Sequence, residues 1–434
     1  MTTADRRRRT GVTALLVIGA VTLAVVVGIG VLLATAAVTG RPVLFVGAGV
    51  FAFLVADAVG AGSVARRARP ARRRAAGGWL FASSAGLLLA VFAGTALVPA
   101  TAIGPPRPVL PGEQQVSLPT GSRLVVTRLP GRTPVTRPSI VVLHGGPGVP
   151  DLAANAAVLA PLTELGADVY LYAQLGTDAS TRLADPRGYG RDRDVADLEA
   201  LRARLGLDRM VLVGHSSGGA LAAAYLAAHP QRVERLVLVS PGALDPGDTS
   251  GELATAGLDG GQRLRLYQEV LAPRALLGYA LLQVRPAAAH AFLGDAEADA
   301  RNDRVLALSV PALFCRPPAD PPPVRGSGFY ALQYPQSATA PVPSDPRPAL
   351  TGLPTPTLIV KGGCDYLSWR SAIDYRTRLP RSQLLYLPEA GHNVHQELPA
   401  VFREAVRAFL DDRPVPGRVP PGADDVPAGY RGPR

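Results

Sequence analysis

The sequence predicts an α/β fold in which helices flank a mostly parallel β-sheet, with a helical cap insertion and, in front, three transmembrane helices. Three observations carry this prediction. From about residue 139, short aliphatic runs alternate with helical patterns, which is typical of βαβ units. More than a hundred residues separate the strands expected at 236–239 and 357–360. Long apolar runs occupy the first 104 residues.

The N-terminal region is predicted to cross a membrane three times. Its apolar runs cover about residues 12–38, 42–65 and 77–103, and each is long enough for a hydrocarbon core about 30 Å thick. The alternatives are a cleaved signal peptide, which has one shorter apolar stretch followed by soluble sequence, and buried helices of a soluble protein.

Asp57 lies within the second apolar run. An acid inside a membrane is by default a candidate functional residue. The simpler alternative is structural, because the side chain lies within about two helical turns of the next arginines. From there it can reach the interface or pair with Arg66 or Arg67.

The positive charge is concentrated in the same region. Of a formal net charge of +11, the first 104 residues carry +9 and the remaining 330 residues carry +2, which argues against a nucleic-acid partner. Arginines precede the first run at 6–9 and fill the loop 66–74, whereas the connection between the first two runs holds Arg41. Basic loops stay on the cytoplasmic side. We therefore expect a multi-pass cell-membrane protein, with the bilayer as a partner and residues after about 105 outside the cytoplasm.

The chain beyond this anchor (1–104) is predicted to have three parts. Residues 105–115 are proline-rich and indicate an extended linker. Residues 413–434 are dominated by Pro, Gly and Asp and indicate a disordered tail. The domain between them, 116–412, contains an insertion at about 242–350 that predicts a cap over the active face.

The secondary structure of that domain follows from its hydrophobic periodicity. Strands are expected at 139–143, 168–172, 210–213, 236–239, 357–360 and 383–386. Helices are expected at 195–205, 217–229 and 400–410, and within the insertion at 261–284 and 287–308.

A serine nucleophile is indicated by Gly214-His-Ser-Ser-Gly218, which fits the pattern G-x-S-x-G. In that motif the serine occupies a sharp, strained strand-to-helix turn, and the glycines let the backbones pass without clashing. The pentapeptide alone is a weak signal in a glycine-rich chain. Its position directly after an expected strand and before an expected helix makes Ser216 the predicted nucleophile.

A serine hydroxyl needs a general base that a carboxylate orients. With this elbow, the acid and then the histidine follow the serine along the chain. Asp365 follows the strand expected at 357–360, and His392 follows the one expected at 383–386. We therefore predict Ser216, Asp365 and His392 as the catalytic triad, with His395 as the fallback base.

Two backbone amides are expected to form an oxyanion hole. One is the amide of Ser217, directly after the nucleophile, and the other belongs to the loop His144-Gly-Gly-Pro-Gly148. Glycines there allow a substrate to approach the backbone closely.

This loop, the serine elbow and the Gly-His at 391–392 resemble the proline iminopeptidase branch of the α/β-hydrolase family. The resemblance covers roughly residues 116–411. It implies the α/β-hydrolase fold, an oxyanion donor at Gly146 and a cap between the sixth and seventh core strands, which matches the insertion.

Two departures from that branch bear on the substrate. Ala173 and Leu175 stand where family members usually have a charged pair within Asp-Gln-Arg-Gly, and His215 and Ser217 stand where the aminopeptidases have Gly and Trp. An aminopeptidase also has to hold the α-ammonium group of its substrate, which favours acids in the cap. Glu269 and the acids of 294–299 are candidates, although a solvated helix face explains them as well.

Three functions follow as hypotheses. The leading one is a proline iminopeptidase-like aminopeptidase acting on short peptides, and the alternative is an esterase or acyl hydrolase of small ester substrates. A non-catalytic membrane binding protein is disfavoured by the intact triad order. The sequence shows no metal cluster or dinucleotide fingerprint, so we expect no cofactor and no metal.

The only two cysteines, Cys315 and Cys364, both fall in the region expected outside the cytoplasm. Disulfides persist in such compartments. The sequence leaves two alternatives, a disulfide between cap and core or two free buried thiols.

Overall fold

The computed structural model describes residues 3–66, 72–99, 107, 109–132, 134–246, 255, 257–318, 323–420 and 422–433, and for residues 3–10 it describes the backbone alone. Parts of several predicted segments lie outside the described residues. These are 1, 2 and 104 of the anchor, 67–71 of the basic loop, 100–103 of the third apolar run, 105, 106 and 108 of the linker, 133 of the catalytic domain, 247–254, 256 and 319–322 of the insertion, and 421 and 434 of the tail.

The chain forms two compact units. The helical unit comprises Met1–Thr101, Val270–Gly294 and Ser337–Thr339. The sheet unit comprises Ala102–Glu269, Asp295–Gln336 and Ala340–Arg434.

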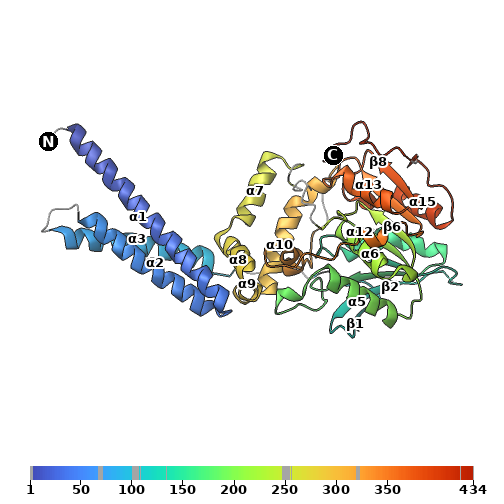
Figure 1. Ribbon diagram of the computed structural model, residues 1–434, viewed down its shortest axis with the longest axis horizontal. Helices are drawn as coiled ribbons and strands as arrows, with labels where there is room; N and C mark the ends of the chain where they lie inside the picture. Colours follow the sequence, from blue (N-terminus) through green and yellow to red (C-terminus); the bar gives the residue numbers. More distant parts are fainter. Residues whose placement is uncertain are drawn as a thin grey trace. The chain divides into compact units, whose positions relative to one another are not determined.

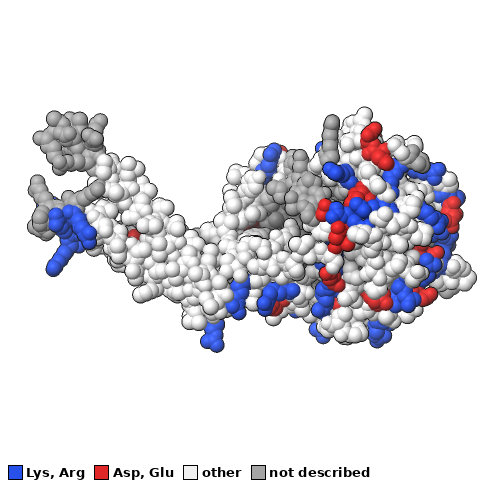
Figure 2. Space-filling view, in the orientation of Figure 1, with Lys and Arg blue, Asp and Glu red and all other residues white. Residues whose placement is uncertain are grey.

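Three long helices dominate the helical unit: α1 (Thr3–Val38), α2 (Pro42–Ala65) and α3 (Arg73–Phe92), which continues as the π-helical turn η2 (Ala93–Leu97) (Figure 1). Within the described residues, Gly11–Val38, Pro42–Ala65 and Arg73–Leu97 are long and apolar enough to cross a membrane. Figure 2 shows their visible surface as almost free of charge, with arginines gathered near the start of α3.

Small residues let α1 and α2 pack closely, as is common between membrane helices. A Cβ on Gly28 would lie 2.8 Å from the Cβ of Phe53, and one on Gly49 would lie 2.7 Å from the Cβ of Leu32. These contacts leave no room for a side chain at either glycine.

Asp57 is buried between α2 and α3, with 2% of its surface exposed. The hydroxyl of Ser84 on α3 donates a hydrogen bond of 2.7 Å to its Oδ2. The partner is therefore a hydroxyl on the neighbouring helix. The described Arg66 forms no ion pair with Asp57, and Arg67 lies outside the described residues.

A single mixed sheet organises the sheet unit, with strand order β1-β2-β4-β3-β5-β6-β7-β8-β9. The strands are β1 (Glu113–Ser117), β2 (Arg123–Leu129), β3 (Ile140–Leu143), β4 (Val169–Ala173), β5 (Met210–His215), β6 (Val233–Val239), β7 (Thr357–Gly362), β8 (Ser382–Leu387) and β9 (Arg418–Val419). Strands β3 to β8 run parallel, and β1, β2 and β9 add antiparallel pairs at the two edges. The predicted mostly parallel α/β fold is confirmed.

Helices alternate with these strands. The longer ones are α4 (Leu152–Leu159), α5 (Arg191–Arg204), α6 (Ser217–Ala228), α13 (Trp369–Arg378) and α15 (Pro399–Leu410), and the short α14 (Val394–Glu397) precedes α15. Helices α4 and α15 pack together against one face of the sheet. A second group of helices consists of α6, which contacts β3, β5 and β6, and of α5 and α12 (Arg347–Leu350), which both pack against α6.

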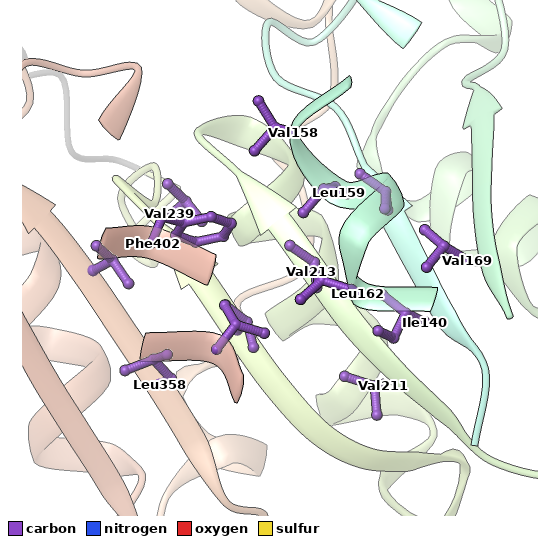
Figure 3. Close-up of a cluster of buried hydrophobic side chains, with 14 of the residues drawn as sticks. Ile140, Val158, Leu159, Leu162, Val169, Val211, Val213, Val239, Leu358 and Phe402 are labelled. Carbon is purple, nitrogen blue, oxygen red and sulfur yellow. The ribbon is translucent and has the colours of Figure 1, made fainter. Parts of the chain in front are cut away.

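The core between the sheet and the α4–α15 layer follows from the alternation of side chains along each strand. Val211 and Val213 of β5 point into it, as do Val239 of β6 and Leu358 of β7 (Figure 3). Phe402 of α15 covers them and is fully buried. Every second residue of these strands is therefore an apolar residue that points into this core. This pattern fixes the register of the strands and, with it, where the loops at their carboxyl ends begin.

The insertion lies between β6 and β7, where the sequence predicted it. It contains α7 (Gly260–Val270), α8 (Pro273–Val284), α9 (Pro286–Phe292), α10 (Asp295–Ser309), η6 (Val310–Leu313), α11 (Phe329–Gln333) and α12. Both α8 and α9 belong to the helical unit, and the rest of these helices belong to the sheet unit apart from the last residue of α7.

The C-terminal segment differs from the expectation of a disordered tail over 413–434. Strand β9 pairs with β8, and the Tyr430 hydroxyl donates to the carbonyl oxygen of Leu367 at 2.7 Å. The amide of Arg431 donates to the carbonyl oxygen of Gly363 at 2.8 Å. Composition predicts disorder from low apolar content, but the described residues of this segment make backbone hydrogen bonds to a sheet edge and to the loop after β7.

Candidate active site

Ser216 lies at the strand-to-helix turn between β5 and α6, with φ 55° and ψ −123°. Positive φ is strained for a residue with a side chain. The flanking glycines are required here, because a Cβ on Gly214 would lie 2.4 Å from the carbonyl oxygen of Gly218, and one on Gly218 would lie 2.3 Å from that of Leu143. This tight turn holds the serine in a fixed position at the carboxyl edge of the sheet.

Asp365 and His392 meet although 27 residues separate them. Asp365 follows β7 and His392 follows β8, so the two loops lie at the same edge of the sheet. Nδ1 of His392 lies 2.7 Å from Oδ1 of Asp365, and both side chains are buried. His395 is also buried, but no described contact joins it to Asp365, and its Nδ1 has no hydrogen-bond partner. The structure therefore pairs the predicted acid with His392.

Lys361 is a site residue that the sequence reasoning missed. Its Nζ donates to Oδ2 of Asp365 at 2.7 Å and to the carbonyl oxygen of Leu367 at 2.9 Å. Both charged side chains are 0% exposed. The amide of Leu367 donates to Oδ1 of Asp365 at 3.0 Å. One signal was present in the sequence, since the only lysine of the chain stands four residues before the predicted acid.

This ion pair sets the charge state of Asp365. Burial acts to raise the pKa of the carboxyl group, but the charge of Lys361, followed by that of His392, outweighs burial and holds the pKa below its ordinary value. Asp365 is thus an ionised acceptor that faces His392 with one oxygen and Lys361 with the other.

Tyr366 packs against His392. Its ring centroid lies 4.5 Å from that of His392. Burial raises the pKa of Tyr366 to about 12, the charge of Asp365 adds to this, and a hydrogen bond with the Ser216 side chain acts in the opposite direction. The centroid of the His215 ring lies 4.8 Å from that of His392. Among the described residues, His392 is hydrogen-bonded through Nδ1 to Asp365 and not to the Ser216 hydroxyl. Such catalytic bonds are often long without substrate.

The glycine-rich loop after β3 lies beside the nucleophile. A Cβ on Gly145 would lie 3.1 Å from the Cβ of Ser216, and Gly146 has φ +117°, which favours glycine. Within the described residues, the amides of Gly146 and Ser217 donate no hydrogen bond outside the regular elements. His144 orders the loop, because its Nε2 accepts from the amide of Gln174 at 3.0 Å.

Buried neutral histidines predict a loss of stability in acid. Burial lowers the pKa of His144 and of His395 to about 4 each, below an unfolded value of about 6.5. Between these values the unfolded chain binds more protons, so stability is complete above about pH 6.5 and is lost as the pH falls towards 4. We expect each histidine to cost about 2 kcal/mol of unfolding free energy between pH 7 and pH 5.

Guanidinium unfolding at pH 7 and pH 5 checks this expectation. His395→Phe removes one of the two groups and should lose about 2 kcal/mol less than the unmodified protein over the same interval. An equal loss in both proteins would show that His395 is not responsible.

Cys315 and Cys364 form a disulfide, which decides between the two alternatives left by the sequence. Cys315 follows η6 of the insertion, and Cys364 directly precedes Asp365. The Glu397 carboxylate reinforces the same junction, because it accepts from the amides of Cys315 at 3.1 Å and Gly391 at 2.7 Å. The insertion is thereby tied to the loops that carry Asp365 and His392.

Removing this cross-link is expected to destabilise the sheet unit. The disulfide closes a loop with a sequence separation of 49, and loops of this length typically contribute about 2–4 kcal/mol. Guanidinium unfolding of Cys315→Ser/Cys364→Ser should show a loss of this size. Reductant should destabilise the unmodified protein and leave the double variant unchanged. Stability unaffected by both treatments would contradict the prediction.

Three candidate acids of the insertion, Glu269, Glu297 and Asp299, have cationic partners. Glu297 pairs with Arg301 at 3.2 Å, and Glu269 pairs with Arg304 at 3.3 Å. Asp299 pairs with Arg182 at 2.9 Å. Their charges are therefore largely compensated within the protein. Among the described residues, no cluster of His, Cys, Asp and Glu could hold a metal ion.

Comparisons with known proteins agree with this geometry. The family model of the alpha/beta hydrolase fold matches residues 138–398. The chain is 40% identical over 113 residues to a proline iminopeptidase from Heyndrickxia coagulans, an alignment that covers 26% of this chain and 36% of that protein. It is 36% identical over 131 residues to a (lyso)-N-acylphosphatidylethanolamine lipase from Mus musculus, covering 29% of this chain and 36% of that protein.

Among solved structures, a proline iminopeptidase from Mycobacterium smegmatis shares 22% identity with a TM-score of 0.45, covering 69% of this chain and 98% of that chain. The chain spans about a third of the length of the curated relatives named above. The matched family segment includes the serine elbow, the glycine-rich loop, Asp365 and His392. This chain is a member of the α/β-hydrolase family.

Proposed function

We propose that this protein is a membrane-anchored serine hydrolase that works through an acyl-enzyme on Ser216. The observation that carries the proposal is the 2.7 Å contact between Asp365 and His392 beside a serine held at positive φ. In this assignment His392 is the general base and Asp365 orients it. The amides of Gly146 and Ser217 stabilise the oxyanion.

The reaction follows from these roles. Nε2 of His392 takes the hydroxyl proton as Oγ of Ser216 attacks the substrate carbonyl carbon, and the carbonyl oxygen becomes an oxyanion between the two amides. The leaving group then departs with the proton from His392. Water, deprotonated by the same imidazole, releases the acid and restores the serine. Asp365 remains ionised throughout, because Lys361 holds its second oxygen.

Two substrate classes share this chemistry. A proline iminopeptidase-like aminopeptidase is supported by the 40% identity to a proline iminopeptidase over 113 residues. An acyl ester hydrolase is favoured by a specific feature of the insertion. Glu269, Glu297 and Asp299 are each paired with an arginine, which leaves these carboxylates a weak attraction for a substrate ammonium group.

Parallel assays test both classes. Purified full-length protein is given aminoacyl arylamides, proline included, and short-chain aryl esters, with a fluorophosphonate-treated sample as the control. Arylamide cleavage supports the aminopeptidase, and cleavage of esters alone supports the acyl hydrolase. Failure on both classes together with absence of fluorophosphonate labelling would favour the non-catalytic alternative.

The proposal also includes a membrane topology. Helices α1 to α3 cross the membrane with the N-terminus in the cytoplasm, and the sheet unit lies outside. The arginine distribution supports this orientation, and the Cys315–Cys364 disulfide supports an oxidising compartment. A reporter that functions only in the cytoplasm should be active when fused after residue 70 and inactive after residues 40 and 110. Activity after residue 110 would refute the orientation.

A further inference from the structure

An apolar cavity of about 470 Å³ lies within the helical unit, and all four of its main helices line it. Its lining is Val25, Gly28, Ile29, Leu32, Gly49, Val50, Phe53, Leu88, Leu89, Val91, Phe92, Thr95, Ala96, Pro273, Leu276, Leu277 and Ala280. Thr95 is the one polar side chain in this lining, and its hydroxyl donates to the carbonyl oxygen of Val91 at 2.7 Å. The cavity walls therefore present hydrocarbon and no side-chain group that requires a polar ligand.

Helix α8 forms the fourth wall of the cavity. Two of its arginines hold it in place by donating hydrogen bonds to carbonyl oxygens at the ends of other helices. Arg274 of α8 donates to the carbonyl oxygen of Ala96 at 3.0 Å and to that of Phe292 at 2.9 Å. Arg285, at the end of α8, donates to the carbonyl oxygen of Ala37 at 3.1 Å. Carbonyls in the last turn of a helix lack intrahelical partners and attract cations. Helix α8 is thus fixed against the C-terminal ends of α1 and of the α3–η2 helix.

The depth of the cavity follows from these residues. They lie in the second half of α1, in the first half of α2 and at the end of α3, which places the cavity between the middle of the bilayer and the side that the proposed topology puts outside. Helix α8 has 12 residues, too few to cross a bilayer. The wall at the end of α3 is the π-helical turn η2, a distortion frequent at functional sites.

We propose that this cavity binds one acyl chain of a bilayer phospholipid. The inference rests on the proposed insertion of α1 to α3 in the membrane. An apolar cavity is a poor site for water. In the hydrocarbon region of a bilayer, the groups that surround the protein are the acyl chains of lipids. Its volume falls within the range of roughly 300–1,000 Å³ typical of small-molecule sites. Because α8 belongs to the insertion between β6 and β7, a chain bound here touches the segment from which this family builds its cap.

Photo-crosslinking tests the site directly. The full chain is reconstituted into nanodiscs of phosphatidylcholine with a diazirine in one acyl chain, and the adducts are mapped by mass spectrometry. We expect adducts on Leu277 of α8 and Leu88 of α3, which line the cavity, in addition to the outward-facing Phe51, which is 70% exposed. Ala280→Phe fills the cavity and should lower the adducts on α8 and α3, relative to Phe51, by about tenfold. Thr95→Phe, from the part of the lining formed by η2, should act in the same way.

Leu87→Phe is the matched control, because Leu87 is 66% exposed on α3 and does not line the cavity. It should leave the adduct ratio unchanged. Equal adduct ratios in all four proteins, or adducts on Phe51 without any on α8, would overturn the inference. Loss of the Phe51 adducts as well would instead refute membrane insertion, and fluorophosphonate labelling of the same samples reports the proposed catalysis separately.

Discussion

Ser216→Ala is expected to abolish covalent labelling by a fluorophosphonate and to lower kcat by about 10⁶-fold. The reason is that no described side chain other than Ser216 combines the strained elbow position with the amides of the glycine-rich loop. Substrate binding should persist, because the alanine removes the nucleophile and leaves the backbone donors in place. Single-turnover kinetics on the preferred substrate and gel detection of the labelled protein measure the two effects.

The control is Ser309→Ala on α10. The Ser309 hydroxyl donates to the carbonyl oxygen of Val305 in its own helix at 2.9 Å and takes no part in the site. This variant should label and turn over like the unmodified protein. Labelling that persists in Ser216→Ala would show that another residue is the nucleophile.

Lys361→Met is expected to lower the free energy of unfolding by about 3–5 kcal/mol, because it leaves the buried Asp365 carboxylate without its cation. The pKa of Asp365 should rise towards its ordinary value, because the charge of Lys361 lowers this pKa in the unmodified protein and is absent from the variant. The acidic limb of the kcat/KM profile should therefore move to higher pH. Guanidinium unfolding and a pH–rate profile measure these two consequences.

Two further variants separate charge from packing. Lys361→Met/Asp365→Asn removes both charges and should recover part of the stability, while kcat stays about 10⁴-fold low because an amide no longer orients and stabilises the imidazolium. Arg378→Met breaks another i,i+4 ion pair, with Asp374 at 2.8 Å, on a partly exposed helix. It should cost less than about 1 kcal/mol. A Lys361→Met protein as stable as Arg378→Met would contradict the assigned role.

The strands that carry the site were predictable because their signal is local. The runs at 139–143, 210–213 and 357–360 are aliphatic and buried on both faces, which is typical of parallel strands. Strands β1, β2 and β9 were missed. Strands β1 and β9 lie at the sheet edges with exposed positions, and β9 is two residues long, so only its pairing with β8 defines it. Strand β2 lies inside the sheet between β1 and β4 and is mostly buried, and its antiparallel pairing with both neighbours is what defines it.

By itself, the sequence determined the three long apolar helices, the α/β alternation and the chain order of Ser216, Asp365 and His392, because each depends on residue types at short spacing. Only the tertiary structure decided which side chains are buried together: Lys361 with Asp365 as a buried ion pair, Tyr366 with His392, Cys315 with Cys364, and α8 with the ends of α1 and α3. The physical reason is that burial and partners set the charge of Asp365 and the contacts of α8. Both are properties of packing, which local pattern does not encode.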